Sequence, residues 1–452
     1  MQTLTCFKAY DVRGRVPEDL DEAIAYRIGR AYAAFVQPKT VAVGRDIRLT
    51  SDGIAAELIR GLTDSGVDVV DIGIGGTEMV YFATFHYGLD GGIMVTASHN
   101  PPNYNGMKMV REQSRPISEA TGLKEIRALA EANHSPTPAR AGRVESRNVM
   151  DDYIAHLLSY IDPARVRPLR VVVNAGNGCA GPIVDRLEAH LPLRFVKLQH
   201  EPDGHFPNGV PNPMIEEKRT VTIDAIAEHE ADLGIAWDGD FDRCFFFDEN
   251  GQFVEGYYIV GLLAQAFLAK TPGSRIVHDP RLTWNTIEIV SAAGGEAVES
   301  KSGHAFIKQT MREVDAIYGG EMSAHHYFRD FSYADSGMIP WLLLVELMST
   351  RNASLSSLIG DRVARFPASG EINRRVDDAV RVQREIEAEY GKAALDISHV
   401  DGLGMDFADW RFNLRASNTE PLLRLNVESR GDFALMQAKT RELLDRIGGE
   451  PG

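Results

Sequence analysis

The sequence predicts an α/β protein of three similar mixed α/β domains followed by an α+β domain at the C-terminal end. The chain has 452 residues, which is too long for one hydrophobic core and indicates several domains. Through most of the chain, short apolar runs alternate with segments of helical periodicity. This alternation is typical of parallel sheets with helices on both faces. It restarts twice, and the last part of the chain has a different order of elements.

The first block begins with a buried strand predicted over residues 40–44. Apolar residues recur at helical spacing over residues 51–62, which predicts a helix there. Further strands are predicted over residues 67–71 and 91–95. The last of these strands ends at a cluster of polar residues, which makes the following loop a candidate for function.

The alternation restarts with strands predicted over residues 169–174 and 233–237. It restarts again with a helix over residues 257–268, a strand over 275–278 and a helix that begins at Thr283. The repeated order of strand and helix predicts that the second and third blocks resemble the first in architecture.

The last block, from about Phe366, has a strand, a helix over residues 380–390, strands near 410–414 and 422–427, and a terminal helix. This order predicts an α+β domain.

Domain boundaries are expected where one block gives way to the next. The four predicted domains are residues 1–150, 151–254, 255–366 and 367–452. A stretch rich in proline and alanine, residues 133–143, is predicted to be a surface loop before the second domain.

The composition is that of a globular protein, with 44% hydrophobic and 25% charged residues. A formal net charge of −16 argues against a general affinity for nucleic acid or anionic membranes, so an anionic substrate would need a locally basic pocket. The three cysteines form no CxxC pair, which argues against a disulfide framework. We see no signal-peptide pattern and no apolar run of about 18 residues, so we expect a cytoplasmic protein that does not span a membrane.

The first chemically informative motif is TASHNP at residues 96–101. It follows the strand predicted over residues 91–95, and α/β proteins place ligands in loops at the carboxyl ends of parallel strands. Ser98 is therefore a candidate nucleophile or phosphate carrier, next to a histidine and an asparagine. The alternative is a turn in which Ser98 and Asn100 cap backbone groups.

The second motif is DGDFDR at residues 238–243, directly after a predicted strand. Asp238, Asp240 and Asp242 offer hard oxygen ligands that can converge on one divalent cation such as Mg²⁺. Three carboxylates so close together would repel one another without a cation, which argues against an ordinary surface loop.

Two other aspartate patterns fit this loop less well. An EF-hand loop beginning at Asp238 would need glycine at Arg243 and helices on both sides, whereas the flanks indicate strands. A haloacid-dehalogenase-like phosphatase also begins with Asp-x-Asp at a strand end, but it usually has threonine or valine where Asp242 stands.

The third motif is GGEMSAHHYF at residues 319–328. If its backbone is extended, Glu321, Ser323 and His325 project to one side and could hydrogen-bond sugar hydroxyls. The alternative is a polar strand end with His326 satisfied in the core.

The fourth motif is RASNTE at residues 415–420, between two predicted strands. The guanidinium of Arg415 offers a bidentate fork to phosphate, and the neighbouring hydroxyl, amide and backbone N–H groups complete a possible phosphate cradle. The alternative is a polar hairpin turn.

Two nucleotide-binding patterns are not met. DIGIGGT at residues 71–77 resembles part of a dinucleotide fingerprint, but its third glycine is at the wrong spacing. The sequence has no G-x-x-x-x-G-K-[ST] pattern, so an ordinary P-loop kinase is not expected.

The four motifs, in this order and one in each domain, resemble those of the α-D-phosphohexomutases, and they are most similar to the bacterial phosphomannomutase branch of that family. The resemblance covers essentially the whole chain. It also includes FKAYDVRG at residues 7–14, NYNGMK at 103–108, DPRLTW at 279–284 and GHAFIK at 303–308.

The resemblance implies four domains around a central cleft and a phosphoserine at Ser98. It implies one Mg²⁺ per chain. The implied metal ligands are Asp238, Asp240, Asp242 and an oxygen of the modified Ser98. The implied basic residues near the reacting oxygen are Arg13, Lys108, Arg243 and His325. The implied substrate-binding residues are Glu321, Ser323, Arg281 and His304, together with Arg415, Ser417, Asn418 and Thr419 at the phosphate that is not reacting.

The implied activity is the interconversion of mannose 1-phosphate and mannose 6-phosphate for nucleotide-sugar and polysaccharide synthesis. A hexose 1,6-bisphosphate would be both intermediate and activator. Lys108 and His325 are both candidates for the base that takes the proton from the attacking hydroxyl. We expect small-molecule sugar phosphates as the only partners of a monomer or homodimer.

Other functions remain open at this point. A dual-specificity phosphomannomutase/phosphoglucomutase or a phosphoglucomutase also fits the resemblance, and a phosphoglucosamine mutase fits less well. A metal-dependent sugar phosphatase would release inorganic phosphate and need no bisphosphate. A metal-binding or sugar-binding module without catalysis would need the aspartates but not Ser98.

Overall fold

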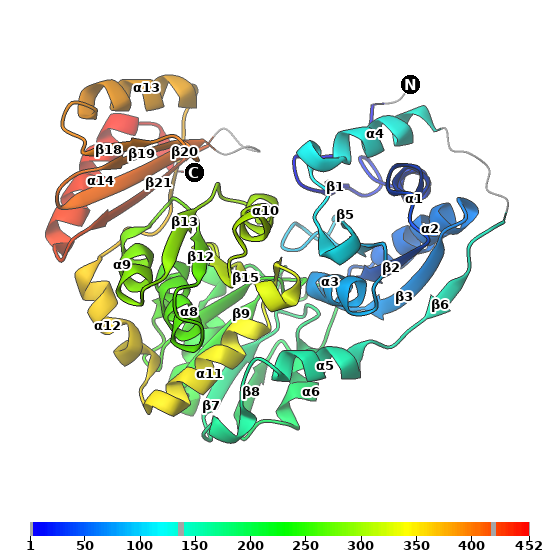
Figure 1. Ribbon diagram of the computed structural model, residues 1–452, viewed down its shortest axis with the longest axis horizontal. Coiled ribbons are helices and arrows are strands. Elements are labelled where there is room, and N and C mark those ends of the chain that lie inside the picture. Colours follow the sequence, from blue (N-terminus) through cyan, green and yellow to red (C-terminus); the bar gives the residue numbers. More distant parts are fainter. Residues whose placement is uncertain (1–2, 134–139, 417–421, 452) are drawn as a thin grey trace. The chain divides into compact units, whose positions relative to one another are not determined.

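The computed structural model describes residues 3–133, 140–416 and 422–451 (Figure 1). The chain divides into two compact units. The first contains Met1–Phe253 and His325–Asn352, and the second contains Val254–Ala324 and Ala353–Gly452. Along the described residues, no helix is long and apolar enough to cross a membrane.

The first unit begins with a six-stranded sheet in the order β1-β5-β4-β2-β3-β6. Its strands are β1 (Val12–Arg15), β2 (Thr40–Arg45), β3 (Asp68–Ile74), β4 (Gly91–Val95), β5 (Tyr104–Arg111) and β6 (Val144–Ser146). The helices in this part of the chain are α1 (Glu22–Val36), α2 (Ser51–Asp64), α3 (Thr77–His86), α4 (Leu123–Ala132) and α5 (Met150–Leu158). The short 3-10 turns are η1 (Glu112–Ser114), η2 (Glu119–Thr121) and η3 (Pro163–Arg165).

The second sheet of this unit includes strands in the order β10-β9-β7-β8. These strands are β7 (Arg170–Asn174), β8 (Arg194–Leu198), β9 (Leu233–Trp237) and β10 (Cys244–Phe247), with α6 (Gly181–Glu188), η4 (Glu216–Lys218) and α7 (Thr220–His229) among them. The returning segment of the unit adds β15 (His326–Phe328), η5 (Arg329–Phe331), β16 (Ala334–Asp335) and α11 (Ile339–Arg351). The short strand β11 (Phe253–Val254) lies at the boundary of the two units.

The second unit contains a parallel group of strands in the order β13-β12-β14, and a six-stranded antiparallel sheet in the order β18-β19-β20-β21-β17-β22. The first group is β12 (Arg275–His278), β13 (Glu296–Glu299) and β14 (Tyr318–Gly320), with α8 (Gly256–Lys270), α9 (Trp284–Ala292), α10 (His304–Val314) and α12 (Leu355–Arg365). The second group is β17 (Ile372–Arg375), β18 (Asp396–Ser398), β19 (Leu403–Asp406), β20 (Trp410–Ala416), β21 (Leu422–Ser429) and β22 (Glu450–Pro451), with α13 (Ala379–Tyr390) and α14 (Phe433–Ile447).

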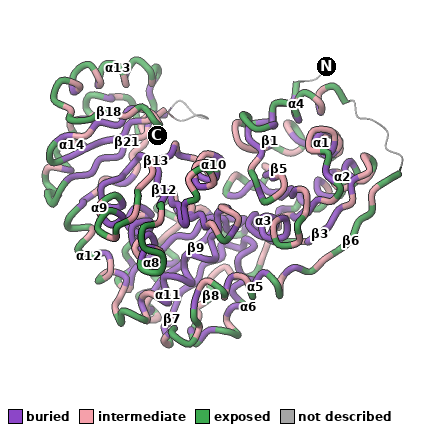
Figure 2. Tube along the Cα trace, viewed as in Figure 1, coloured by how far each residue is buried: buried purple, intermediate pink, exposed green. Residues whose placement is uncertain are grey.

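Most predicted elements are confirmed, and the strands predicted over residues 91–95, 233–237 and 275–278 agree residue for residue with β4, β9 and β12. β4 and β9 are easy to predict because they are apolar runs that are buried along their length, as the tube in Figure 2 shows for β9. The terminal α+β part is confirmed by the antiparallel sheet with α13 and α14.

The sheets of the first unit are mixed, so the predicted mixed α/β architecture is confirmed. β5 runs antiparallel to β4, and β10 runs antiparallel to β9. The connections, residues 96–103 and 238–243, are too short for the helical crossover that parallel neighbours need, so each pair forms a hairpin. The two motifs that carry the aspartates and Ser98 are therefore both hairpin connections.

Apolar residues at helical spacing explain why the helices pack where they do. Ile28 of α1, Leu58 of α2 and Ile126 of α4 belong to one buried cluster with Val41 and Ile93 of the first sheet. Burying such a side chain contributes about 1.5–3 kcal/mol each. This core supports β2 and β4, whose carboxyl ends lead into the loops of the site.

Candidate active site

Ser98 lies in the connection between β4 and β5, and its backbone is in the left-handed region with φ of 48°. The Ser98 N–H donates to Thr96 Oγ1 at 2.9 Å, and the Asn100 N–H donates to the Ala97 carbonyl at 2.9 Å. A left-handed conformation costs a residue other than glycine roughly 1 kcal/mol, so the surrounding contacts must enforce it. The loop therefore holds Ser98 in one defined orientation.

Arg48 is the residue that holds this loop, and it was not predicted from the sequence. Its guanidinium is fully buried and pairs with Asp46, with Nε and Oδ2 3.4 Å apart. It donates to four backbone carbonyls of the loop, those of Ser98 (2.9 Å), Asn100 (2.5 Å), Pro101 (2.7 Å) and Tyr104 (3.0 Å). The signal in the sequence was a polar cluster directly after the strand at residues 40–44, the same kind of position that identified Ser98.

Arg13 of β1, predicted to lie near the reacting oxygen, supports the same loop from another side. Its Nη1 donates to the Ala97 carbonyl at 2.8 Å and to Asn100 Oδ1 at 2.5 Å, and its Nη2 contacts Asp11 Oδ2 at 2.5 Å. Arg13 thus brings positive charge to the loop while it orders the backbone beside Ser98.

The three aspartates lie in the connection between β9 and β10 and are almost fully buried. Oxygen atoms of Asp238, Asp240 and Asp242 all lie within 4.8 Å of one another. Phe241 bends the loop through a left-handed φ of 44°. The prediction that these three carboxylates converge is confirmed.

Asp238 connects this loop to Ser98. The Ser98 hydroxyl donates to Asp238 Oδ2 at 2.7 Å. The same oxygen accepts from Arg243 Nε at 3.0 Å and from Nη2 at 2.7 Å, so Arg243 neutralises the carboxylate nearest to the serine. Arg243 also contacts the ring of His99. Burial, together with the charges of Arg243 and Arg13, holds the pKa of His99 well below its usual range, so this imidazole is neutral.

Lys108 lies between the other two carboxylates. Its ammonium donates to Asp240 Oδ2 at 2.7 Å and to Asp242 Oδ2 at 2.5 Å. Burial opposes the charged form, but the two carboxylates outweigh it and raise the pKa of Lys108. Burial and the charge of Asp240 raise the pKa of Asp242 to about 6. The positive charges of Lys108 and Arg243 therefore do not fully balance the three carboxylates.

The donor set fits a divalent cation. Carboxylate oxygens are the ligands that Mg²⁺ and Ca²⁺ prefer, and three of them converge here. Asp240 Oδ1 is buried and accepts no hydrogen bond from any residue that the structure describes. A buried oxygen without a donor is costly, and a bound cation would satisfy it. The acidic triad can therefore bind a metal ion.

The glycines of the rejected dinucleotide pattern have a different use. The Thr77 hydroxyl donates to Asp240 Oδ2 at 2.5 Å, and the Thr77 N–H donates to the Asp240 carbonyl at 3.1 Å. A Cβ atom at Gly76 would lie only 2.3 Å from the ring of Phe241. Gly76 is therefore required for the close approach of α3 to the aspartate loop, a contact that spacing alone could not indicate.

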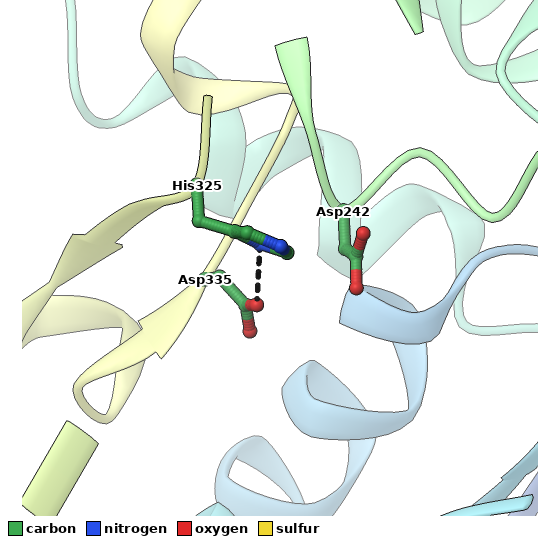
Figure 3. Close-up of side chains that lie close together, drawn as sticks. All are labelled: Asp242, His325 and Asp335. Atoms are coloured by element: carbon green, nitrogen blue, oxygen red, sulfur yellow. Dashed lines mark ion pairs between the residues drawn. The ribbon is translucent and has the colours of Figure 1, made fainter. Parts of the chain in front are cut away.

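His325 also belongs to the first unit, where it faces Asp335 and Asp242 (Figure 3). Its Nδ1 lies 3.1 Å from Asp335 Oδ2, and Asp335 is buried. The pairing fixes the direction of the imidazole ring, because Asp335 is itself held in the strand pair of β15 and β16. Asp335 was not predicted from the sequence, since it lies outside every motif.

The backbone at residues 321–325 is not extended, so the condition for Glu321, Ser323 and His325 to project to one side is not met. Ala324 has a left-handed φ of 68°, and its N–H donates to the Glu321 carbonyl at 3.1 Å, so the chain turns between β14 and β15. His325 consequently groups with the first unit and Glu321 and Ser323 with the second. The glycines and polar residues of the motif favour this turn over a strand.

Glu321 and Ser323 of the second unit meet at Arg281, which was predicted to bind substrate. Arg281 Nη2 lies 2.7 Å from Asp279 Oδ2, 3.2 Å from Ser323 Oγ and 3.5 Å from Glu321 Oε1. Glu321 Oε1 also accepts from the Gly303 N–H at 2.8 Å, directly before α10. This contact connects Glu321 to the predicted residue His304, the first residue of α10. The second unit thus gathers Arg281, Ser323, Glu321 and the start of α10.

Arg415, at the end of β20, is also in the second unit, where its Nη2 lies 3.3 Å from Glu371 Oε2. The predicted residues Ser417, Asn418 and Thr419 lie outside the described residues.

Comparison with known proteins identifies the family. Four family models match consecutive parts of the chain. They are the phosphoglucomutase/phosphomannomutase alpha/beta/alpha domains I (residues 5–137), II (residues 151–251) and III (residues 255–366) and the C-terminal domain (residues 371–444).

The chain belongs to the phosphoglucomutase/phosphomannomutase family.

Relatives of similar length support the assignment to the phosphoglucomutase/phosphomannomutase family. A phosphomannomutase of Escherichia coli is 60% identical over 98% of this chain and 99% of its own length. A protein of Xanthomonas campestris named as a phosphohexose mutase is 58% identical over 99% of this chain and its whole length. The crystal structure of a phosphoglucomutase/phosphomannomutase family protein of Burkholderia thailandensis has a TM-score of 0.88 and 32% identity. The match covers 100% of this chain and 99% of the chain in the Burkholderia structure.

In this member of the phosphoglucomutase/phosphomannomutase family, Arg48→Lys should loosen the Ser98 loop. Lysine keeps the charge but cannot reach four carbonyls from one ammonium. Each buried carbonyl left without a donor costs about 1–3 kcal/mol. We expect the Ser98 and Asn100 amides to exchange with solvent about tenfold faster or more, as measured by hydrogen–deuterium exchange.

The matched control is Arg60→Lys, because Arg60 pairs with Glu57 on the surface. This control should leave exchange in the Ser98 loop unchanged. Equal protection of the loop in Arg48→Lys and wild type would show that Arg48 does not hold it.

Proposed function

We propose that this chain is a phosphomannomutase that interconverts mannose 1-phosphate and mannose 6-phosphate. The observation that carries the proposal is the hydrogen bond of 2.7 Å from the Ser98 hydroxyl to Asp238, one of three buried carboxylates that converge beside Arg243. Phosphoryl transfer needs a carrier oxygen, neutralisation of charge and fixed positions, and this arrangement supplies all three.

In the forward half-reaction, Ser98 carries the phosphoryl group. The bond from phosphorus to Ser98 Oγ breaks as a bond forms to the free hydroxyl of the sugar phosphate, which gives a hexose 1,6-bisphosphate. Arg243, at the carboxylate nearest to Ser98, offsets charge on the transferring group. The bisphosphate then turns and returns its other phosphate to Ser98, so the enzyme is regenerated.

Asp238, Asp240 and Asp242 would hold one Mg²⁺ per chain together with an oxygen of the phosphoserine. When bound, the cation would stabilise the negative charge that builds up on the transferred group. Lys108 neutralises Asp240 and Asp242 on the protein side of this cluster.

Of the two candidates for the base that takes the proton of the attacking hydroxyl, Lys108 is held as an ammonium by Asp240 and Asp242, so we assign this role to His325. Asp335 pairs with Nδ1 of His325, so a proton from the sugar would go to Nε2. A carboxylate at Nδ1 orients the ring and stabilises the imidazolium that forms.

Sugar and phosphate are bound by the groups of the second unit. We assign Glu321 and Ser323 to the sugar hydroxyls, with Arg281 and His304 as further contacts. We assign Arg415 to the phosphate that is not reacting. The remaining residues of this phosphate site are Ser417, Asn418 and Thr419.

Hexose 1,6-bisphosphate is also the activator, because it rephosphorylates Ser98 when an intermediate escapes. The product feeds nucleotide-sugar and polysaccharide synthesis in the cytoplasm, and the chain acts on these small molecules as a monomer or homodimer.

Ser98→Ala is expected to lose nearly all mutase activity, because among the described residues of the connection at 96–103 only the Ser98 hydroxyl donates to Asp238. The assay follows conversion of mannose 1-phosphate to mannose 6-phosphate with Mg²⁺ and a trace of hexose 1,6-bisphosphate. Wild-type protein should carry one phosphate on Ser98 by intact mass and peptide mapping. Ser65→Ala, which removes a hydroxyl that donates to the Gly61 carbonyl at the end of α2, is the control and should keep the phosphate. Turnover close to the wild-type rate in Ser98→Ala would exclude the phosphoserine mechanism.

Asp240→Asn should weaken Mg²⁺ binding by at least about tenfold, since it replaces a charged oxygen ligand by an amide. The measurement is Mg²⁺ titration by calorimetry, with the rate at saturating Mg²⁺ as a second readout. Asp248→Asn, a buried aspartate after β10 outside the triad, is the control and should bind Mg²⁺ like wild type. Unchanged Mg²⁺ affinity in Asp240→Asn, or full activity in excess chelator, would remove the triad from the mechanism.

A further inference from the structure

Three arginines of the second unit converge on one carboxylate, that of Glu371. Glu371 Oε2 lies 3.4 Å from Arg281 Nη1 and 3.3 Å from Arg415 Nη2, and Oε1 lies 3.1 Å from Arg424 Nη1. Glu371 directly precedes β17, and Arg415 and Arg424 lie on β20 and β21. Glu371 and Arg424 belong to none of the sequence motifs.

The register of the sheet places two of these arginines directly opposite each other. Arg415 of β20 pairs with Arg424 of β21 in the antiparallel ladder. Like charges at opposed positions are destabilising unless an anion lies between them. The side chains of Arg281, Arg415, Arg424 and Glu371 are 3%, 14%, 27% and 10% exposed, so solvent screens this repulsion only in part.

The carboxylate does not satisfy all the donors around it. The Nε atoms of Arg281, Arg415 and Arg424 are buried and have no hydrogen-bond acceptor among residues 3–133, 140–416 and 422–451. Burial, together with the positive charge of Arg281 and Arg424, lowers the pKa of Arg415. Asp279, which pairs with Arg281, and Asp401, 3.8 Å from Arg415 Nη1, leave these Nε donors unmet as well. An anion with more acceptor oxygens than one carboxylate, such as a phosphate monoester, matches this surplus of donors.

We infer that Glu371 takes the place of the substrate's non-reacting phosphate in the free enzyme and competes with that phosphate for Arg415 and Arg424. This inference rests on the proposed function, because it assigns Arg415 to that phosphate. It adds Arg424 as a second phosphate-binding arginine and Glu371 as a positioning residue. Glu371 keeps the two guanidinium groups in place when no phosphate is bound.

Competition between Glu371 and the phosphate for the arginines favours turnover in a reaction with two half-reactions. The bisphosphate must leave the arginines with one phosphate and return with the other, so binding that is too tight would stop turnover between the two steps. A carboxylate that re-forms its pairs with the arginines as the phosphate leaves lowers the free-energy cost of release. Glu371 thereby lowers the affinity of the site for phosphate and speeds the reorientation of the bisphosphate intermediate.

The test is Glu371→Gln, which keeps the shape of the side chain and removes its charge. We expect the dissociation constants of inorganic phosphate and of mannose 1-phosphate to fall about tenfold, measured by calorimetry at fixed ionic strength. In the mutase assay, KM and kcat should both fall, because release slows. Arg424→Gln should weaken phosphate binding, and Glu371→Gln should lose its effect when Arg415 is also changed to Gln.

Glu288→Gln is the matched control. Glu288 also accepts from two arginines of the second unit, Arg362 at 2.8 Å and Arg365 at 2.7 Å, but neither contacts Glu371. This control should leave phosphate affinity unchanged.

Weaker or unchanged phosphate binding in Glu371→Gln, with thermal stability equal to wild type, would overturn the inference. If Glu371→Gln lowers thermal stability, Glu371→Asp decides: it keeps the charge and should bind phosphate with wild-type affinity, and tighter binding in Glu371→Asp would also overturn the inference.

These binding results are independent of catalysis. An active mutase without tighter binding in Glu371→Gln contradicts only the inference, and tighter binding in a chain without mutase activity contradicts only the proposed function.

Discussion

The mutual repulsion of Asp238, Asp240 and Asp242 is the constraint on which the rest of the first unit depends. One hairpin connection brings the three carboxylates together in a buried place, where water cannot screen them. Arg243 and Lys108 supply two positive charges at contact distance, and the triad fits a divalent cation as the third partner. The Ser98 hydroxyl then donates its hydrogen bond to Asp238, a carboxylate whose charge is already balanced. A phosphoryl carrier needs such a balanced environment.

The second unit gathers positive charge instead. Arg281, Arg415 and Arg424 all contact the carboxylate of Glu371, in a chain whose formal net charge is −16. Further carboxylates lie beside two of these arginines, with Asp279 and Glu321 at Arg281 and Asp401 at Arg415. A local cluster of arginines in an acidic protein favours an anionic ligand there without a general affinity for polyanions. The first unit thus holds carboxylates that fit a cation beside the Ser98 hydroxyl, and the second holds guanidinium groups that fit an anion.

The sequence was sufficient for the parts of the protein that depend on local patterns. Buried strands such as β4 and β9 were predicted correctly because a short apolar run between turn residues favours a strand. The convergence of Asp238, Asp240 and Asp242 was predicted correctly because their close spacing in one short loop favours a shared site. Arg48 was missed because it holds a loop that is distant in sequence, and Asp335 was missed because it lies outside every motif although its partner His325 is near in sequence. The antiparallel pairing of β5 and β10 with their neighbours was not predicted, because the strand–helix alternation along the rest of the chain favoured parallel sheets.

The most direct test of the central claim is transfer of a labelled phosphoryl group from Ser98. Enzyme that carries ³²P on Ser98, prepared by exchange with labelled hexose 1,6-bisphosphate, is mixed with unlabelled mannose 1-phosphate and Mg²⁺ in a single turnover. The mechanism predicts that the label appears in sugar bisphosphate and mannose 6-phosphate. Label released mainly as inorganic phosphate, at the rate of substrate consumption, would identify a phosphatase and contradict the mutase account.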